Sequence, residues 1–237
     1  MAPWTLAAVL ACPAWAGAAD ADRLYANRAV LADARRAAGI WQQRLDADPG
    51  DFQSAWKLAR AAYWLGGHEP AEPARVAAFE SGMAAARAAI ASRPSLPEGH
   101  FWLAANMGGL AELKGLRAGL RYRRSIREHL ERALALDPSF QKGSADRALG
   151  RWYFKVPGLF GGSNRKSEAH LLRALTYHPD SIVTRLFLAE TYEDMGRTAD
   201  ALRLLGEIET LPVDPDWEPE DREFKQQARR LKERLEK

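Results

Sequence analysis

A phrase that recurs along the chain constrains its fold more than any other feature: a run rich in alanine and leucine, followed by a proline. The run reaches Pro49, Pro94, Pro138 and Pro179, and a weaker copy reaches Pro212. Successive prolines are 45, 44, 41 and 33 residues apart. A proline cannot continue the hydrogen bonding of a helix, so each one is expected to end a helix and begin a turn. Repetition at this period predicts a stacked array of helical units.

Two helices fit between successive prolines, and the unit that ends at Pro212 shows them best. Leu188, Ala189 and Tyr192 fall on one face of a first helix, and Gly196 then breaks it before a second apolar stripe begins. The chain as a whole is rich in alanine, arginine and leucine and poor in β-branched residues, which favours helix over strand. The sequence therefore predicts an all-α protein with roughly ten helices and no sheet.

The expected organisation is a single domain over residues 20–237, built from antiparallel helix pairs. A C-terminal helix with a charged outer face is expected to cap the array, because a terminal repeat needs a polar outer surface. The expected pairs are 22–49, 51–94, 97–138, 144–179 and 181–212, and the expected capping helix is 219–236.

The first nineteen residues form a segment of their own. They carry no charged side chain, and the apolar run from Trp4 is interrupted by Pro13 and followed by small residues that offer cleavage sites. The run is too short to span a bilayer, so residues 1–19 are interpreted as a signal peptide and the protein is expected to be exported, to the periplasm or cell envelope. Cys12, the single cysteine, lies in a stretch similar to a bacterial lipobox, which leaves a lipid anchor at Cys12 as an alternative.

No constellation of catalytic or metal-binding residues stands out. The five histidines lack metal-ligand spacing. Residues 158–167 contain glycines before Lys166, but a phosphate-binding loop needs a glycine where Arg165 stands, and a strand where 149–155 is expected to be helical. This stretch is interpreted as a turn, with Ser163 or Asn164 capping the next helix. The sequence therefore predicts a protein that is not an enzyme and that uses no metal or cofactor.

The repeat resembles the tetratricopeptide repeat, whose signature places Leu-Gly, Tyr, Gly, Ala and Pro at these offsets. Residues 99–138 and 149–175, with their long inserted turns, are similar to the regulator of microtubule dynamics protein family and its bacterial relatives. A more distant likeness is to the TatT-type periplasmic lipoproteins associated with TRAP transporters. These resemblances imply a tetratricopeptide-like α-α superhelix and imply a function only weakly. The exported, alanine- and arginine-rich chain is typical of bacteria, so a microtubule role is not expected.

In tetratricopeptide proteins the first helix of each pair lines a concave groove, and the resemblance implies a groove here as well. Aromatic side chains interleaved with arginines would suit a protein or peptide partner, or an amphipathic small ligand. The expected groove residues are Trp56, Arg60, Tyr63, Phe101, Arg147, Arg151 and Phe154.

The strongest cluster of charge lies between residues 117 and 127. Arg117, Arg121 and Arg124 recur at helical spacing, with Arg123 and Arg127 beside them. Three interpretations stay open: a docking face for an anionic envelope membrane, a docking face for an acidic partner, or a solvated surface. The net charge of the whole chain is only +3, which gives no reason to expect a nucleic acid partner.

Together these features favour a non-enzymatic scaffold that binds a protein partner in the periplasm or at the cell envelope. The TatT likeness implies an alternative, a ligand-binding accessory of a solute transporter.

Overall fold

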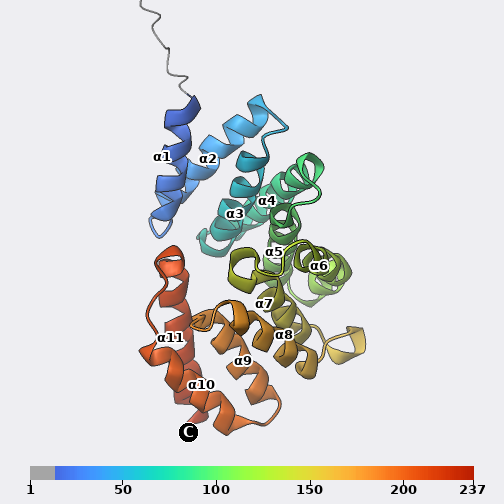
Figure 1. Ribbon diagram of the computed structural model, residues 1–237, viewed down its shortest axis with the longest axis vertical. Helices are drawn as coiled ribbons and strands as arrows, with labels where there is room; N and C mark the ends of the chain where they lie inside the picture. Colours follow the sequence, from blue (N-terminus) through green and yellow to red (C-terminus); the bar gives the residue numbers. More distant parts are fainter. Residues whose placement is uncertain (1–13) are drawn as a thin grey trace, which may run out of the picture.

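The computed structural model describes residues 14–237, and all regular secondary structure in that range is helical (Figure 1). The described residues form eleven α-helices and two short 3-10 helices. This confirms the prediction of an all-α fold. The first thirteen residues, including Cys12, lie outside the described residues, and α1 begins at Ala14, within the segment interpreted as a signal peptide. The signal peptide and the lipid anchor therefore stay predictions.

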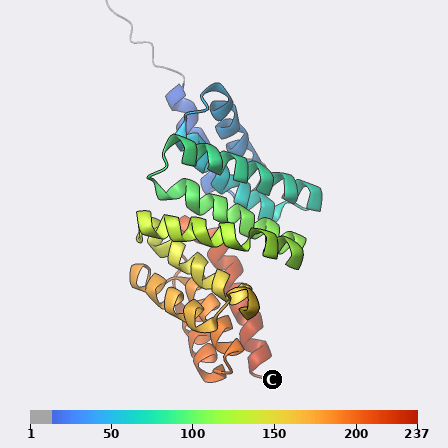
Figure 2. The same cartoon turned by 90° about the vertical axis from the view of Figure 1, so that its right-hand side faces the viewer.

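The α-helices form antiparallel pairs in chain order, stacked along the long axis of the molecule (Figure 2). A last helix follows the fifth pair and provides the predicted C-terminal cap. The pairs are α1 (Ala14–Ala26) with α2 (Leu31–Ala47), α3 (Phe52–His68) with α4 (Glu72–Ser92), α5 (Pro97–Lys114) with α6 (Leu116–Leu136), α7 (Phe140–Lys155) with α8 (Asn164–Tyr177), and α9 (Ile182–Asp194) with α10 (Thr198–Thr210); the 3-10 helices are η1 (Gly158–Phe160) and η2 (Pro215–Trp217), and the cap is α11 (Glu218–Leu235).

The repeated prolines set the ends of the helices. Each second helix of a pair ends two residues before its proline, and the residue between them leaves the helical conformation. Asp48, Arg93, Asp137 and His178 stand at this position, each with φ between −136° and −154°. A residue that precedes proline is forced toward extended backbone because the proline ring clashes with a helical one. The chain therefore turns at regular intervals, and the next pair begins.

The turn between α7 and α8 is longer than the other turns, and it is not a phosphate-binding loop. It follows a helix and contains η1, and the Ser163 side chain accepts a hydrogen bond from the Lys166 backbone N–H at 3.3 Å. Ser163 is therefore the N-cap of α8; the sequence analysis had predicted either Ser163 or Asn164 in this role.

The apolar core has two main parts. One large cluster runs through α1 to α7, and a second runs through α8 to α11. They meet where α7 crosses α8: a Cβ atom placed on Gly150 would lie only 2.6 Å from the Leu171 side chain, so a glycine is required for this close approach. No helix in residues 14–237 is long and apolar enough to cross a membrane.

Within the first cluster, the Phe79 ring of α4 is held between two neighbouring helices. The ring is 2% exposed and lies against Gly66 of α3 and Gly109 of α5. A Cβ atom at these positions would come within 2.5 Å and 2.3 Å of the ring, respectively. The small residues let three helices approach one aromatic ring, which fixes the spacing of α3 and α5.

Two adjacent glycines of α5 allow a direct test of this packing. We expect Gly109→Ala to lower the free energy of unfolding by about 1–3 kcal/mol, because the methyl group would overlap the enclosed Phe79 ring. Gly108→Ala is the matched control: nothing lies within 4 Å of its added Cβ, so we expect a gain of about 0.5–1 kcal/mol from reduced backbone entropy. Urea denaturation of both variants measures the difference, and equal effects would contradict this packing.

Candidate functional site

The first helices of the pairs form the inner wall of the superhelix. α3 packs on α5, α5 on α7, α7 on α9, and α9 on α11, in addition to the contacts within each pair. Each second helix packs mainly on its own partner and on the first helix that follows it. In a curved array the helices on the inner side are closer together than those on the outer side, and here it is the first helices that contact one another. The inner face is therefore built from α3, α5, α7, α9 and α11.

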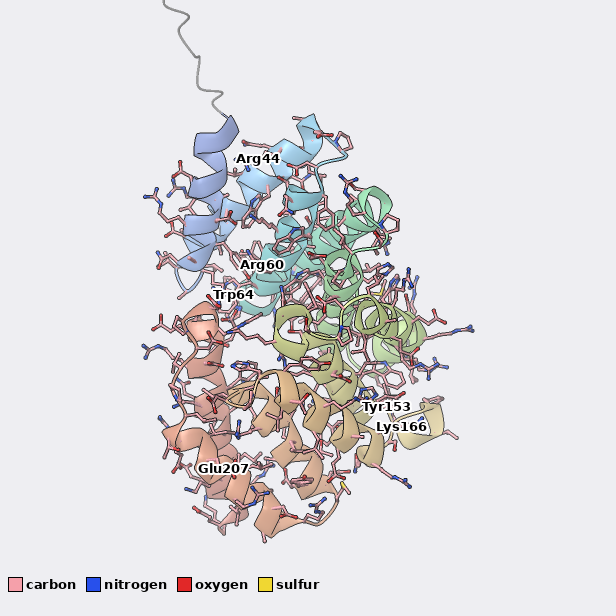
Figure 3. All side chains as sticks on the ribbon, viewed as in Figure 1. Arg44, Arg60, Trp64, Tyr153, Lys166 and Glu207 are labelled. Atoms are coloured by element: carbon pink, nitrogen blue, oxygen red, sulfur yellow. The ribbon has the colours of Figure 1, made fainter. Side chains whose placement is uncertain are left out.

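Side chains of α11 join the two ends of this wall. Arg28, in the turn between α1 and α2, is 5% exposed and donates from Nε and Nη2 to the Glu220 carboxylate at 2.8 and 2.5 Å. Its Nη2 also donates to the Asp216 carbonyl at 2.9 Å. On α3, Trp64 Nε1 donates to the Arg28 carbonyl at 2.9 Å, and His68 Nε2 lies 3.0 Å from Glu223 Oε1. The start of α11 is thus fastened to the N-terminal end of the superhelix (Figures 1 and 3).

Tyr63 and Arg147 are two neighbouring groups of the inner face with shifted pKa values. The Tyr63 side chain is 43% exposed, yet burial raises its pKa to about 12, with Glu112 adding to the rise and the charges of Arg151 and Arg147 opposing it. Burial likewise lowers the pKa of Arg147 to about 10, against the opposing effects of Asp221 and Tyr63. Each of the two groups opposes the pKa shift of the other, so the Tyr63 side chain of α3 and the Arg147 side chain of α7 lie near each other on the inner face.

The two arginines expected in the groove on α7, Arg147 and Arg151, have different surroundings. Arg151 forms an ion pair with Glu190 of α9, and its guanidinium lies 4.3 Å from the Phe187 ring centroid and 5.5 Å from that of Phe154. Arg147 donates to Ser144 Oγ at 2.5 Å, and no carboxylate of the described residues lies within ion-pair distance of it. Arg151 is therefore paired directly with a carboxylate, whereas Arg147 has only the charge of Asp221 near it, beyond ion-pair distance.

A second desolvated cation lies nearer the N-terminal end of the wall (Figure 3). The Arg60 guanidinium carbon lies 4.2 Å from the Tyr25 ring centroid and 5.0 Å from that of Trp56. Its Nε is buried without a hydrogen-bond partner, and burial lowers the pKa of Arg60. The aromatic rings are therefore the main neighbours that offset its charge.

Phe101 differs from the expected groove residues. It is 8% exposed, and its ring meets Trp102 and Phe140 edge-on, with centroids 5.0 and 5.5 Å away. It packs in the core between α5 and α7 and has little surface to offer a ligand. The expected frame had placed it on the inner face. Phe154 is half-buried beside Arg151 and keeps part of its ring open.

The basic cluster lies on α6, a second helix, and so belongs to the outer side of the superhelix. Arg124 pairs with Glu128 at 2.8 Å and Arg127 with Glu131 at 3.5 Å. Arg123 donates to the Leu120 carbonyl at 2.5 Å. Arg117 and Arg121 line a surface pocket of about 410 Å³. The cluster is therefore partly paired and lies apart from the inner face.

Several residues on or beside the inner face were not predicted from the sequence: Phe187, Glu190, Glu220 and Asp221 on its helices, and the buried Tyr25 of α1 beside Arg60. Phe187 and Glu190 stand on the first helix of the fifth pair, where the repeat frame used for earlier pairs would have found them. The α11 carboxylates could not have been found in this way, because their approach to α3 and α7 depends on how far the superhelix curves. No group of three or more His, Cys, Asp or Glu side chains within residues 14–237 could hold a metal ion.

The architecture is that of solved tetratricopeptide-repeat proteins. A thermophilic protein of this type from Thermus thermophilus superposes with a TM-score of 0.62, covering 86% of this chain and 94% of the other at 23% identity. The structure of MamA superposes with a TM-score of 0.52, covering 76% and 90% of the two chains at 15% identity. At these identities the likeness concerns the fold. The protein is a tetratricopeptide-like helical-repeat protein, as the sequence predicted.

The sequence also fixes the family. The family model of regulator of microtubule dynamics protein 1-3 matches residues 18–160, and the chain belongs to this family. Regulator of microtubule dynamics protein 3 from Xenopus laevis is 30% identical over 182 residues, 69% of this chain and 38% of that protein. The Rattus norvegicus protein is 25% identical over 173 residues, 66% of this chain and 36% of that protein. The chain thus matches less than two fifths of the length of these relatives.

The fastening of α11 can be tested by comparing two arginines that each donate to a carboxylate from Nε and Nη2. We expect Arg28→Ala to lower the free energy of unfolding by about 2–4 kcal/mol, because it leaves the Glu220 charge partly buried without its partner. Arg35→Ala is the control: Arg35 makes the same two-pronged pair with Glu69, but is half exposed, so we expect a loss below about 1 kcal/mol. Urea denaturation measures both, and similar losses would show that α11 is not held by Arg28.

Proposed function

We propose that this protein is a non-enzymatic scaffold that binds a peptide segment of a partner protein on its inner face, in the periplasm or at the cell envelope. The observation that carries the proposal is Arg147: a half-buried cation, without an ion-pair partner in the described residues, that lies near the open Tyr63 side chain. A desolvated charge is costly until an opposite charge approaches. A carboxylate from a partner would offset this cost.

The surroundings of Arg147 suggest the kind of segment that would bind. Tyr63 of α3 and the half-buried Phe154 of α7 offer aromatic surface on the same inner face, which an apolar side chain of the peptide would cover. Arg151 has its charge satisfied by Glu190, so it contributes surface and position more than charge. The favoured ligand is an acidic residue or a C-terminal carboxylate beside an apolar side chain. Tetratricopeptide-like folds commonly bind protein partners in this general manner.

Site-specific photo-crosslinking in cells tests the proposal. A photoreactive phenylalanine at Tyr63 should form adducts with a partner protein in envelope extracts. The same residue at Tyr177 is the matched control, because Tyr177 is also 43% exposed but lies on α8, a second helix. Equal yields of adduct from the two positions would contradict the proposal. So would a protein found in the cytosol that forms no adduct from the Tyr63 position. An apolar molecule retained in native mass spectrometry, with no protein adduct, would instead favour the transporter-accessory alternative.

The role of Arg147 follows in a second measurement with the captured partner. We expect Arg147→Ala to weaken binding by about 1–3 kcal/mol, the size of a charge-assisted hydrogen bond. We expect Arg151→Ala to have the smaller effect, because its pairing with Glu190 already satisfies its charge. Isothermal titration with both variants, alongside far-ultraviolet circular dichroism to check helix content, gives the comparison. A larger effect at Arg151 would reverse the assignment of the two arginines.

A further inference from the structure

The side of the molecule formed by α6 and the α7–α8 turn carries exposed apolar side chains. Leu159 of η1 is 89% exposed, Leu116 at the start of α6 is 67% exposed, and Phe160 is 38% exposed. Figure 2 turns this side toward the viewer, with α6 running across it and the α7–α8 turn beside it. Leucines on a protein surface are common, but a leucine as open as Leu159 at the tip of a turn buries almost nothing within the chain.

The tip is held in place by several contacts. The Arg123 guanidinium carbon of α6 lies 5.4 Å from the Phe160 ring centroid, and Trp152 Nε1 donates to the Arg123 carbonyl at 2.9 Å. The Ser163 N–H donates to the Tyr153 carbonyl at 2.8 Å and closes the base of the turn. Leu159 is therefore presented at a fixed position next to α6.

Cations surround these apolar side chains. Arg117, Arg121 and Arg124 are exposed on α6, and Lys155, Arg165 and Lys166 are exposed on either side of η1. Acidic side chains are also present: Glu128 and Glu131 pair with Arg124 and Arg127, Glu72 pairs with Lys114 at 2.7 Å, and Glu80 lines the pocket. Within the described residues no ion pair forms at Arg117, Arg121, Lys155, Arg165 or Lys166, so the surface keeps a net positive charge.

The pocket beside Arg117 combines both properties. Its volume is about 410 Å³, and Val76, Leu110 and Tyr122 contribute apolar lining. Lys114, Arg117 and Arg121 contribute the cationic lining. An anionic group can contact the cations while the chain attached to it lies on the apolar lining.

We propose that this surface, defined by Leu116, Arg117, Arg121, Arg124, Leu159 and Phe160, docks on an anionic phospholipid membrane. Separated apolar side chains ringed by cations suit a bilayer interface, because leucine and phenylalanine enter the acyl boundary while guanidinium groups stay at the phosphates. An acidic protein surface would match the charge, but it would leave the isolated Leu159 tip without a continuous apolar patch to pack on. The inference goes beyond the scaffold role, and it uses neither the inner face nor Arg147.

Vesicle flotation with the full chain tests the inference. We expect the protein to bind vesicles that mix phosphatidylcholine with phosphatidylglycerol, to bind phosphatidylcholine alone much less, and to dissociate as salt is raised. The triple variant Arg117→Ser, Arg121→Ser and Arg124→Ser should bind on the order of a hundred-fold more weakly, since each cation at an anionic surface adds roughly five-fold. Leu159→Ser should lose roughly ten-fold.

Control variants make the outcomes distinct. Arg222→Ser, Arg229→Ser and Arg230→Ser remove three exposed arginines from α11, on the opposite side of the molecule, and should bind vesicles as the wild type does (Figure 1). Arg147→Ala should also keep vesicle binding, so the membrane-docking inference can hold even if the proposal of peptide binding on the inner face fails. Equal losses in the two triple variants would overturn the inference. The inference would also be overturned if the protein bound vesicles containing phosphatidylglycerol no more strongly than vesicles of phosphatidylcholine alone. An acidic protein that bound this surface in their place would identify the other interpretation as correct.

Discussion

The buried ion pair between Arg28 and Glu220 is the interaction on which the character of the inner face depends. It joins the turn of the first helix pair to the capping helix α11, 192 residues further along the chain. Side chains therefore connect the two ends of the superhelix. Replacement of a buried ion pair by apolar groups is often neutral for stability, and the clearer role of such a pair is to select one arrangement. Here that arrangement brings the Asp221 and Glu220 carboxylates toward Tyr63 and Arg147.

Closure has an electrostatic consequence that connects the fold to binding. Charged side chains on an open concave surface are hydrated and interact weakly with a ligand, because water screens them. Arg147 is half-buried, and burial lowers its pKa, so its charge is less hydrated than that of an arginine on an open surface. In the proposed binding mode, a carboxylate that reaches Arg147 meets a charge that water screens less.

The sequence predicts the parts of this protein that depend on local rules, and it misses those that depend on curvature. The repeated prolines predict the ends of the helices because the residue before a proline is confined to extended backbone, and the second helices do end two residues before them. The repeat frame also places Tyr63 and Arg147 on first helices, as the structure does, and their role in binding stays a prediction. Phe101 stands on a first helix too, but the aromatic residues around it hold its ring in the core. The Arg151–Glu190 pair and the α11 carboxylates join separate repeats, and no local pattern encodes them.

The family match and the two parts of the core divide the chain at nearly the same place. The match ends at residue 160, and the second apolar cluster begins at Leu171 on α8. The matched segment supplies the cationic side of the inner face, Arg60 and Arg147, whereas the C-terminal part supplies Glu190, Glu220 and Asp221. Arg147 of the matched segment therefore stands near a carboxylate that the C-terminal part supplies, because the charge of Asp221 opposes the lowering of its pKa. The proposed binding at Arg147 thus depends on both parts of the chain, since the matched segment alone lacks the carboxylates of α9 and α11.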